Sequence, residues 1–312
     1  MFTGPGIATA ARAYRHVLPA AVPDTSPLPA TQSSLAAALR VLLAGVDDGA
    51  RAAVWIAEDL TGVRRARVLA FPDAAVAPDV AARALAIARR RAAGEPLQYA
   101  LGHADFHGLR LAVTPAVLIP RPETEELVEH ALTALRGRSA PRVLDAGTGS
   151  GAIALAIKAA RPDADVHALD VSRAALDVAR ANAAALGLDV MFHTADLLAD
   201  HLPPTLGGAF DLVVSNPPYI PDTDAASLEP HVRDHEPALA LFTGPDALVF
   251  YHALARHGAR HIADGGVLWC ELDADHADAT AACFSGAAWA SARVETDAAR
   301  RARFVEARRA VA

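Results

Sequence analysis

Val143-Leu144-Asp145-Ala146-Gly147-Thr148-Gly149-Ser150-Gly151 is the stretch that decides the fold of this 312-residue chain. Its first residues are mainly apolar, as in a short buried strand, and an alanine-rich segment of helical character follows directly at residues 152–160. The glycines between them let the backbone approach a ligand closely, at a conformational cost that an ordinary loop has no reason to bear. The stretch therefore predicts a strand, a ligand-binding turn and a helix.

The same strand–helix alternation continues along the chain. Strands are expected at residues 142–146, 166–169, 190–194, 210–215 and 266–272, with helices at residues 152–160 and 172–186. Such alternation specifies an α/β fold with a mostly parallel sheet and helices on both of its faces. Ligands bind at the carboxyl ends of the strands in such sheets, which is where the glycine turn falls.

The part of the chain before this alternation is organised differently. Residues 1–32 are rich in Ala, Pro, Ser and Thr and are interpreted as a loosely ordered extension. Residues 33–95 carry apolar residues at helical spacing and predict a small helical domain. Residues 96–120 change to two-residue alternation around the turn-forming pair His107-Gly108, which predicts a β-hairpin linker. Residues 121–312 form the remaining domain and begin with a helix, because proline and acidic residues suit a first turn.

Composition excludes several classes of protein. The net charge of −7 disfavours broad, non-specific adhesion to nucleic acid, so no direct nucleic-acid binding is required. The two cysteines, Cys270 and Cys283, have no metal-ligand spacing, and we expect neither a disulfide nor a metal. No segment approaches the roughly 20 apolar residues of a membrane span, and no secretory signal pattern is present. We therefore expect a cytoplasmic protein without a membrane partner.

The glycine spacing favours one cofactor over another. Dinucleotide-binding loops space their glycines as GxGxxG, whereas Gly147–Gly151 reads GxGxG, which favours S-adenosyl-L-methionine. Asp170 ends the second strand, where a carboxylate accepts hydrogen bonds from both ribose hydroxyls. Asp196 follows the third strand and is expected to face the adenine edge, with Leu197 packing on the ring. The expected cofactor-binding residues of these segments are Gly147, Thr148, Gly149, Ser150, Gly151, Asp170, Asp196 and Leu197.

Asn216-Pro217-Pro218-Tyr219 follows the fourth strand, next to the expected cofactor strand. An amide or aromatic amine nitrogen is a weak nucleophile, because its lone pair is delocalised, so positioning is the main catalytic contribution. The Asn216 side-chain oxygen and the Pro217 carbonyl can each accept one N–H of a planar NH₂ group. Pro218 stiffens the backbone and Tyr219 offers a flat aromatic face. Proline also simply ends strands, so a plain strand-terminating loop is the alternative interpretation.

No arrangement of a nucleophile with a general base is evident, and none is needed, because the methylated nitrogen loses its proton readily. The histidines are scattered along the chain. Most of those in the last third are interpreted as surface residues, namely His231, His235, His252, His257 and His261.

Several motifs together resemble the HemK/PrmC family of release-factor glutamine methyltransferases, over about residues 35–305. The motifs are Gly94-Glu95-Pro96-Leu97-Gln98-Tyr99, Phe106-His107-Gly108, Leu118-Ile119-Pro120-Arg121-Pro122-Glu123-Thr124-Glu125, the glycine turn and Asn216-Pro217-Pro218-Tyr219-Ile220-Pro221. The resemblance implies a seven-stranded, Rossmann-like class I methyltransferase domain, preceded by a helical substrate-recognition domain and a hairpin linker. It also implies the substrate, which is the glutamine of the Gly-Gly-Gln motif in class-I peptide chain release factors.

The family's functional residues carry over by position. Its cofactor contacts fall on Gly147–Gly151, Asp170, Leu197 and Asn216, and its glutamine contacts fall on Asn216, Pro217, Pro218 and Tyr219. Of these, Asn216, Pro217 and Tyr219 are the expected catalytic residues, and Phe106 is a further candidate for the glutamine pocket. The chain departs from the family at Glu271-Leu272-Asp273, where Glu-Ile-Gly is usual, and at residues 297–301, which leaves the last hairpin in doubt.

Three alternatives remain beside this interpretation. The nearest is a glutamine methyltransferase that modifies a ribosomal protein. An adenine-N6 methyltransferase uses the same loop, but it needs a basic docking surface and a flipped base, which the acidic balance of the chain disfavours. A binding protein that retains the cofactor without catalysis is disfavoured by the intact Asn216–Tyr219 motif.

Overall fold

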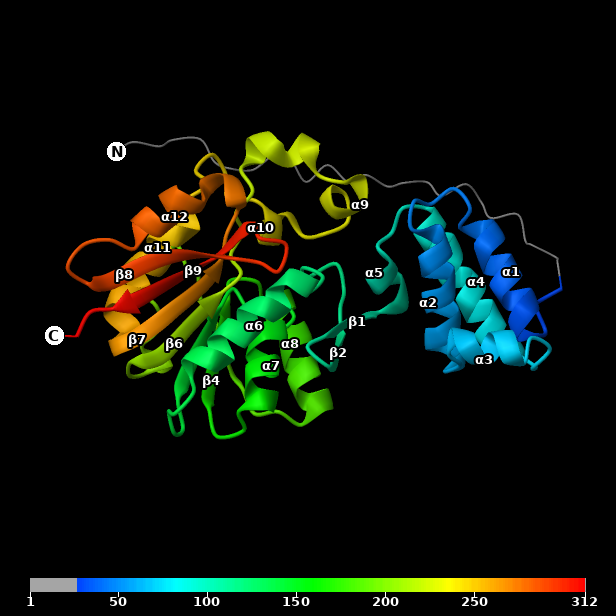
Figure 1. Cartoon of the computed structure of the whole chain (residues 1–312), viewed down its shortest axis with the longest axis horizontal. Helices are drawn as coiled ribbons and strands as arrows, with labels where there is room; N and C mark the ends of the chain where they lie inside the picture. The colour runs from blue at the N-terminus through cyan, green and yellow to red at the C-terminus, as the bar shows by residue number, and fades with distance from the viewer. Residues whose placement is uncertain (1–26, 312) are drawn as a thin grey trace, which may run out of the picture.

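The computed structural model describes residues 27–311, so residues 1–26 of the predicted extension lie outside the described part. Figure 1 shows a helical unit at one end of the molecule and a sheet with flanking helices at the other. A short segment that contains the hairpin β1 and β2 joins them. The fold class is the predicted α/β class, with a seven-stranded sheet.

Five helices make up the first part of the described chain: α1 Gln32–Leu42, α2 Gly49–Thr61, α3 Arg65–Ala70, α4 Pro78–Ala92 and α5 Leu97–Leu101. Thr31 caps α1, because its side chain accepts a hydrogen bond from the Ser34 backbone N–H, so ordered structure begins just before the predicted end of the extension. Leu35, Leu39 and Ile56 are completely buried among these helices. Their burial explains the helical spacing of apolar residues in this region.

The linker differs in part from its prediction. The hairpin consists of β1 His103–Phe106 and β2 Leu109–Ala112, which pair antiparallel. The first residues of the predicted hairpin linker, Leu97–Leu101, form α5 instead. Gly102 ends this helix with φ +85°, a left-handed conformation that glycine adopts without strain. The chain is therefore helical up to Gly102, and the two-residue alternation of the hairpin begins only after it, at β1.

The large sheet contains β3 Arg142–Ala146, β4 Asp165–Asp170, β5 Met191–Thr194, β6 Phe210–Ser215, β7 Ile262–Glu271, β8 Trp289–Thr296 and β9 Ala302–Arg309. The strand order is β5-β4-β3-β6-β7-β9-β8. Neighbours among β3 to β7 are parallel, whereas β9 runs antiparallel to both β7 and β8. The carboxyl ends of five parallel strands therefore meet at one edge of the sheet.

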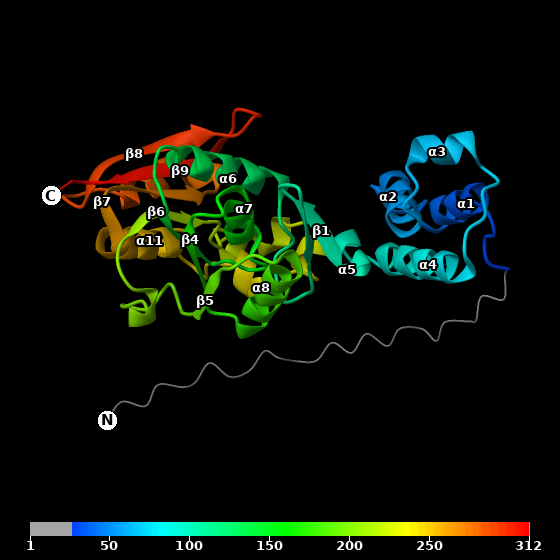
Figure 2. The same ribbon diagram turned by 90° about the horizontal axis from the view of Figure 1, so that it is seen from below.

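Helices cover both faces of this sheet (Figure 2). The helices α6 Pro122–Ala134, α7 Ala152–Ala160 and α8 Arg173–Leu186 pack on one face, and α11 Val249–His261 and α12 Ala277–Cys283 on the other. Two short helices, α9 Pro230–Arg233 and α10 Ala238–Leu241, lie in the connection from β6 to α11. Within residues 27–311, none of the helices has the length and apolar character needed to cross a membrane.

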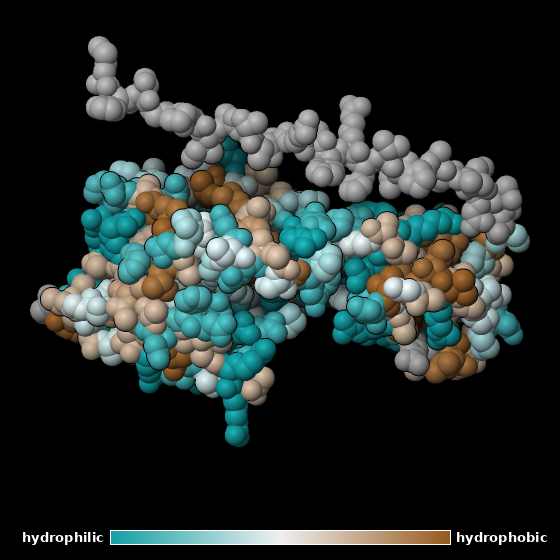
Figure 3. Space-filling view, turned by 90° about the horizontal axis from the view of Figure 1, so that it is seen from above, coloured by the Kyte–Doolittle hydropathy of each residue, from teal (hydrophilic) through white to brown (hydrophobic). Residues whose placement is uncertain are grey.

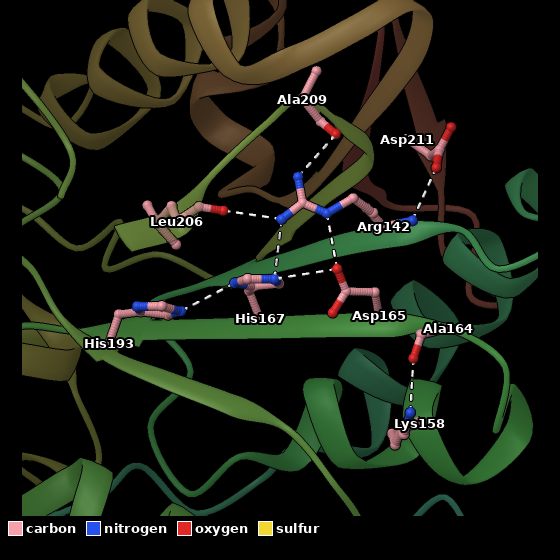
Figure 4. A network of polar contacts seen from close by, with 9 residues as sticks. All are labelled: Arg142, Lys158, Ala164, Asp165, His167, His193, Leu206, Ala209 and Asp211. Atoms are coloured by element: carbon pink, nitrogen blue, oxygen red, sulfur yellow. Dashed lines mark hydrogen bonds and ion pairs between the residues drawn. The ribbon is translucent and has the colours of Figure 1, made fainter. Parts of the chain in front are cut away.

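A partly buried polar network, with His167 at its centre, lies against one face of the sheet across β3, β4 and β5 (Figure 4). The Arg142 guanidinium lies 3.1 Å from His167 Nε2, and His167 Nδ1 lies 3.0 Å from His193 Nε2. Because a guanidinium can only donate, His167 accepts from Arg142 at Nε2 and donates from Nδ1 to His193 Nε2, while Asp165 Oδ2 lies further from the same Nε2, at 3.4 Å. Asp165 accepts a hydrogen bond of 2.8 Å from Arg142 Nε. The network therefore suits two neutral histidines.

We expect the contribution of His167 and His193 to the free energy of unfolding to fall as the pH is lowered from about 7.5 to about 5.5. Burial lowers the pKa of His167 and of His193 from the ordinary value of 6.5. Below that value the unfolded chain binds protons more readily than the folded chain, so stability present at higher pH is lost as the pH falls toward the folded-state pKa. Urea unfolding at both pH values tests this.

Between pH 7.5 and pH 5.5, the change in the free energy of unfolding should be less unfavourable in His167→Gln than in the wild type, because the variant lacks one of the two neutral rings. The matched control is His201→Gln, which changes an exposed histidine. Equal pH dependence in the two variants would refute the assignment of the network as the source.

Candidate active site

A cavity of about 270 Å³ opens at the carboxyl ends of β3, β4, β5 and β6. Its walls come from the residues that follow each of these strands and from residues 116–124, which lead into α6. The predicted cofactor turn and the predicted catalytic loop both line it. Segments that are far apart in sequence therefore meet around one space at the ligand-binding edge of the sheet.

The glycine turn presents its backbone to this cavity. Gly147 and Gly149 line it, and a Cβ atom built on either would meet no other atom within 4 Å. The backbone N–H of Gly149 donates to Asp170 Oδ2 at 2.9 Å, and Gly149 has φ +54°. Because a side chain here would be strained and would project into open space, glycine leaves room for a ligand against the backbone.

The last two residues of the turn are placed differently. Ser150 lines the cavity, but Gly151, which was predicted to bind the cofactor, does not. A Cβ on Gly151 would lie 3.0 Å from Leu155 Cδ1 and 3.2 Å from Ala179 Cβ. Gly151 is therefore needed for close packing beneath the turn, where α7 begins.

Asn182 in α8 supports the turn and was missed by the sequence analysis. Its Nδ2 donates to the Ser150 carbonyl at 2.9 Å and to the Ala112 carbonyl at 3.1 Å, and its Oδ1 accepts from the Ala112 N–H at 2.7 Å. Asn182 is buried and thus ties the cofactor turn to strand β2. Its only signal in the sequence is a polar residue on the buried face of an alanine-rich helix.

Asp145, near the end of β3, supports the glycine turn from the protein interior and does not line the cavity. It is completely buried, and its Oδ2 accepts hydrogen bonds from Thr148 Oγ1 at 2.6 Å and from the Ala154 N–H at 3.1 Å. Its Oδ1 is buried without a partner among the described residues. Burial raises the pKa of Asp145 to about 7, and the nearby charge of Asp170 acts in the same direction. The hydrogen bonds of Asp145 therefore hold the glycine turn and the start of α7 together.

Asp170 lies where the sequence predicts it, at the end of β4 and in the cavity wall. Its Oδ1 accepts from the Ser172 N–H at 2.8 Å, while Oδ2 accepts from Gly149. Burial raises its pKa, although these backbone hydrogen bonds favour the ionised form. The carboxylate therefore holds the glycine turn in place and keeps lone pairs for a ligand in the cavity.

Asp196 and Leu197 also line the cavity, after β5. Asp196 is exposed and its Oδ1 accepts from the Leu198 N–H at 2.8 Å, whereas Leu197 is buried. His257 was predicted to be a surface residue, and that prediction is wrong. It is buried, with Nε2 3.0 Å from the carbonyls of Leu197 and Ala199. His257 therefore holds the backbone of this wall from behind.

Asn216, Pro217 and Pro218 line the same cavity as the glycine turn. Tyr219 does not line it. Its ring packs against the core on the α11 side, and its hydroxyl donates to Glu271 Oε1 at 3.4 Å. Burial and the Glu271 carboxylate raise the pKa of Tyr219 well above its ordinary value. The predicted catalytic loop is thus brought to the cavity except for its aromatic residue.

Two residues behind Asn216 were not predicted as site residues. Asn216 Nδ2 donates to Thr124 Oγ1 at 3.1 Å, and Thr124 Oγ1 donates to Glu271 Oε2 at 2.8 Å. Both Thr124 and Glu271 are buried. Burial raises the pKa of Glu271, while the Thr124 hydrogen bond and the charge of Arg303 oppose that rise.

The other wall contains a second unpredicted pair. Arg121 lines the cavity, and its Nη2 donates to Glu236 Oε1 at 2.6 Å. The buried Glu236 also accepts from the Ile119 N–H at 3.2 Å. These bonds fasten the segment before α6 to the segment after α9. Phe106, a candidate for the glutamine pocket, is 1% exposed and does not line the cavity, because its apolar ring belongs to the hydrophobic core that includes Leu111 and residues of α6 and α7.

The chain is similar in sequence to a family of known proteins. Residues 35–102 match the model of the PrmC N-terminal domain, and residues 124–229 match that of the methyltransferase small domain. The chain is 44% identical over 274 residues to a release factor glutamine methyltransferase of Deinococcus radiodurans, covering 88% of this chain and 96% of that protein. It is 42% identical over 273 residues to one of Burkholderia pseudomallei, covering 86% and 94%. A solved protein-(glutamine-N5) methyltransferase (release factor-specific) from Alicyclobacillus acidocaldarius has 30% identity and a TM-score of 0.40, covering 64% of this chain and 99% of that one.

Proposed function

Because the chain belongs to the release factor glutamine methyltransferase family, we propose that its cavity brings S-adenosyl-L-methionine and a glutamine side chain of a class-I peptide chain release factor together. The enzyme transfers a methyl group to the side-chain amide nitrogen of the glutamine in the Gly-Gly-Gln motif. The observation that carries this proposal is one cavity lined by both the glycine turn and Asn216-Pro217-Pro218. A cytoplasmic location follows from that substrate.

When bound, S-adenosyl-L-methionine supplies an electrophilic methyl group on a sulfonium centre. We assign its binding to Gly147–Gly151, Asp170, Asp196, Leu197 and Asn216. The open backbone of Gly147 and Gly149 supports this assignment, as does the cavity-facing carboxylate of Asp170. Gly151 contributes through packing, since its α-carbon has no room for a side chain.

We assign the acceptor glutamine to the loop after β6. Asn216 Oδ1 and the Pro217 carbonyl each accept one N–H of the planar amide, which aligns its nitrogen for attack. Pro218 lines the same wall and limits the movement of this backbone. Tyr219 does not line the cavity, so we assign it an indirect role, in which its hydroxyl contact with Glu271 holds the end of this loop in place. The charge that develops on the methylated nitrogen is relieved by loss of a proton.

We propose that the helical region, residues 33–95, recognises the protein substrate and that residues 121–312 carry out methyl transfer. Large apolar side chains are exposed on the helical region, with Val41 at 77%, Leu69 at 72% and Phe71 at 59% exposure. Figure 3 shows an apolar area over this unit. Exposed apolar side chains of this kind suit contact with another protein.

The proposed function is tested with S-adenosyl-L-methionine labelled in its methyl group. The full chain is incubated separately with a purified class-I release factor, a ribosomal large-subunit protein fraction and methyl-free DNA, and products are located by mass spectrometry. We expect label on the glutamine of the Gly-Gly-Gln motif. Label on the ribosomal fraction or the DNA alone would refute the proposed substrate.

A further inference from the structure

We propose that Thr124 and Glu271 fix the orientation of the Asn216 side-chain amide, so that its oxygen and not its nitrogen faces the acceptor. Thr124 and Glu271 are thereby positioning residues that select a glutamine over a glutamate. This inference rests on the proposed function, because the orientation matters for catalysis only if Asn216 Oδ1 accepts an N–H of the substrate amide.

The direction of each hydrogen bond follows from the chemistry of the groups. A carboxylate can only accept, and Glu271 accepts from the hydroxyl of Thr124 at 2.8 Å and from that of Tyr219 at 3.4 Å. A hydroxyl has one proton, so Thr124 Oγ1 can only accept from its other neighbour. That neighbour is Asn216 Nδ2, at 3.1 Å. Asn216 Nδ2 therefore donates to Thr124, and Asn216 Oδ1 remains available to accept a hydrogen bond from a ligand.

The fold places these three side chains together. Ser215 of β6 pairs with Cys270 of β7 in parallel register, so Asn216 and Glu271, one residue later on each chain segment, are neighbours at the same sheet edge. Thr124 comes from the first turn of α6, which packs over β7. Thr124 and Asn216 both line the cavity, whereas Glu271 is 1% exposed behind them. The network therefore acts on the cavity from the protein interior.

Orientation decides which acceptor is recognised. An asparagine amide has nearly the same shape in its two orientations, which differ by a half rotation, but one edge accepts hydrogen bonds and the other donates them. With Oδ1 in the cavity, the wall accepts from the NH₂ of glutamine and opposes a carboxylate. With Nδ2 in the cavity, the wall would favour the carboxylate of glutamate. A buried network that holds one orientation thus gives specificity by disfavouring the wrong partner.

Thr124→Val removes the hydroxyl while keeping the shape of the side chain. Thr124→Ser keeps the hydroxyl, and Thr133→Val makes the same change at an exposed position of α6. The first measurement is hydrogen exchange of the Asn216 side-chain NH₂ by NMR in the full ¹⁵N-labelled chain, assigned with Asn216→Ala. We expect protection in the wild type, Thr124→Ser and Thr133→Val, and its loss in Thr124→Val. This readout does not depend on methyl transfer, so it separates failure of the inference from failure of the proposed function.

The second measurement compares binding of a class-I release factor with that of the same factor carrying glutamate in place of the motif glutamine. We expect Thr124→Val to reduce the wild-type preference for glutamine by about 10-fold and kcat by about 10- to 100-fold. Thr124→Ser should restore both the preference and kcat.

Protection and glutamine preference that both survive in Thr124→Val would overturn the inference, as would a serine variant that behaves like valine. Should Thr124→Val fail to fold, Glu271→Gln gives an independent test. Its amide can donate to Thr124, which frees the hydroxyl proton and permits both orientations of Asn216. The glutamine preference should then fall as well, and an unchanged preference would count against the proposal.

Discussion

Asn216→Ala should lower kcat for methylation of the release factor by about 10³-fold, because the variant loses an acceptor that aligns the weakly nucleophilic amide. Asn216 lines the cavity together with the glycine turn, and its Nδ2 is held by Thr124. The alanine also leaves a small space rather than a steric block. Methyl transfer from labelled S-adenosyl-L-methionine under single-turnover conditions measures the chemical step directly.

Two controls separate this effect from misfolding. Thermal unfolding of Asn216→Ala should remain close to that of the wild type, because the side chain is only partly buried. Thr223→Ala, which changes an exposed residue further along the same connection, should retain full activity. Turnover by Asn216→Ala within a few-fold of the wild-type rate would show that the amide is not used for positioning.

The central parallel strands were predictable because they contain short apolar runs that are buried on both faces. Val143 and Leu144 in β3, and Leu212 and Val214 in β6, are all buried. The edge strand β8 lacks that pattern, since its residues are mostly exposed or half-buried. No periodicity in sequence marks such a strand, and only the family resemblance implied a seven-stranded sheet. The helix α5 escaped prediction for another reason, because it is set by its local boundaries at Pro96 and Gly102.

Some residues of the site could be predicted from the sequence and others could not. The glycine turn and the Asn216 loop could be identified because each directly follows a predicted strand, and parallel strands bring their carboxyl ends together. Thr124 and Glu271 are separated by 147 residues, and Thr124 lies 92 residues from Asn216, so their contacts depend on how α6 packs over the sheet. Phe106 is the opposite case, a residue predicted for the site that does not lie in it. Its motif suggested a place in the pocket, but a motif does not give the direction of a side chain, and the ring is in the core.

Asp170→Ala should weaken binding of S-adenosyl-L-methionine by at least about 100-fold, because hydrogen bonds to a charged group contribute about 1.5–3 kcal/mol each and the carboxylate is assigned to two ribose hydroxyls. Isothermal titration calorimetry measures the affinity. Asp189→Ala, at an exposed position after α8, is the matched control and should bind normally.

A second cause of weakened binding must be separated from the first, because Asp170 also accepts the Gly149 N–H at 2.9 Å and so supports the glycine turn. A donor analogue that lacks one ribose hydroxyl distinguishes them. The wild type should bind this analogue at least about 10-fold more weakly than the parent compound, whereas Asp170→Ala should bind the two alike, since the group that senses the hydroxyl is gone. If the variant still discriminates as strongly as the wild type, the carboxylate acts only by shaping the turn, and the ribose is held by another part of the cavity.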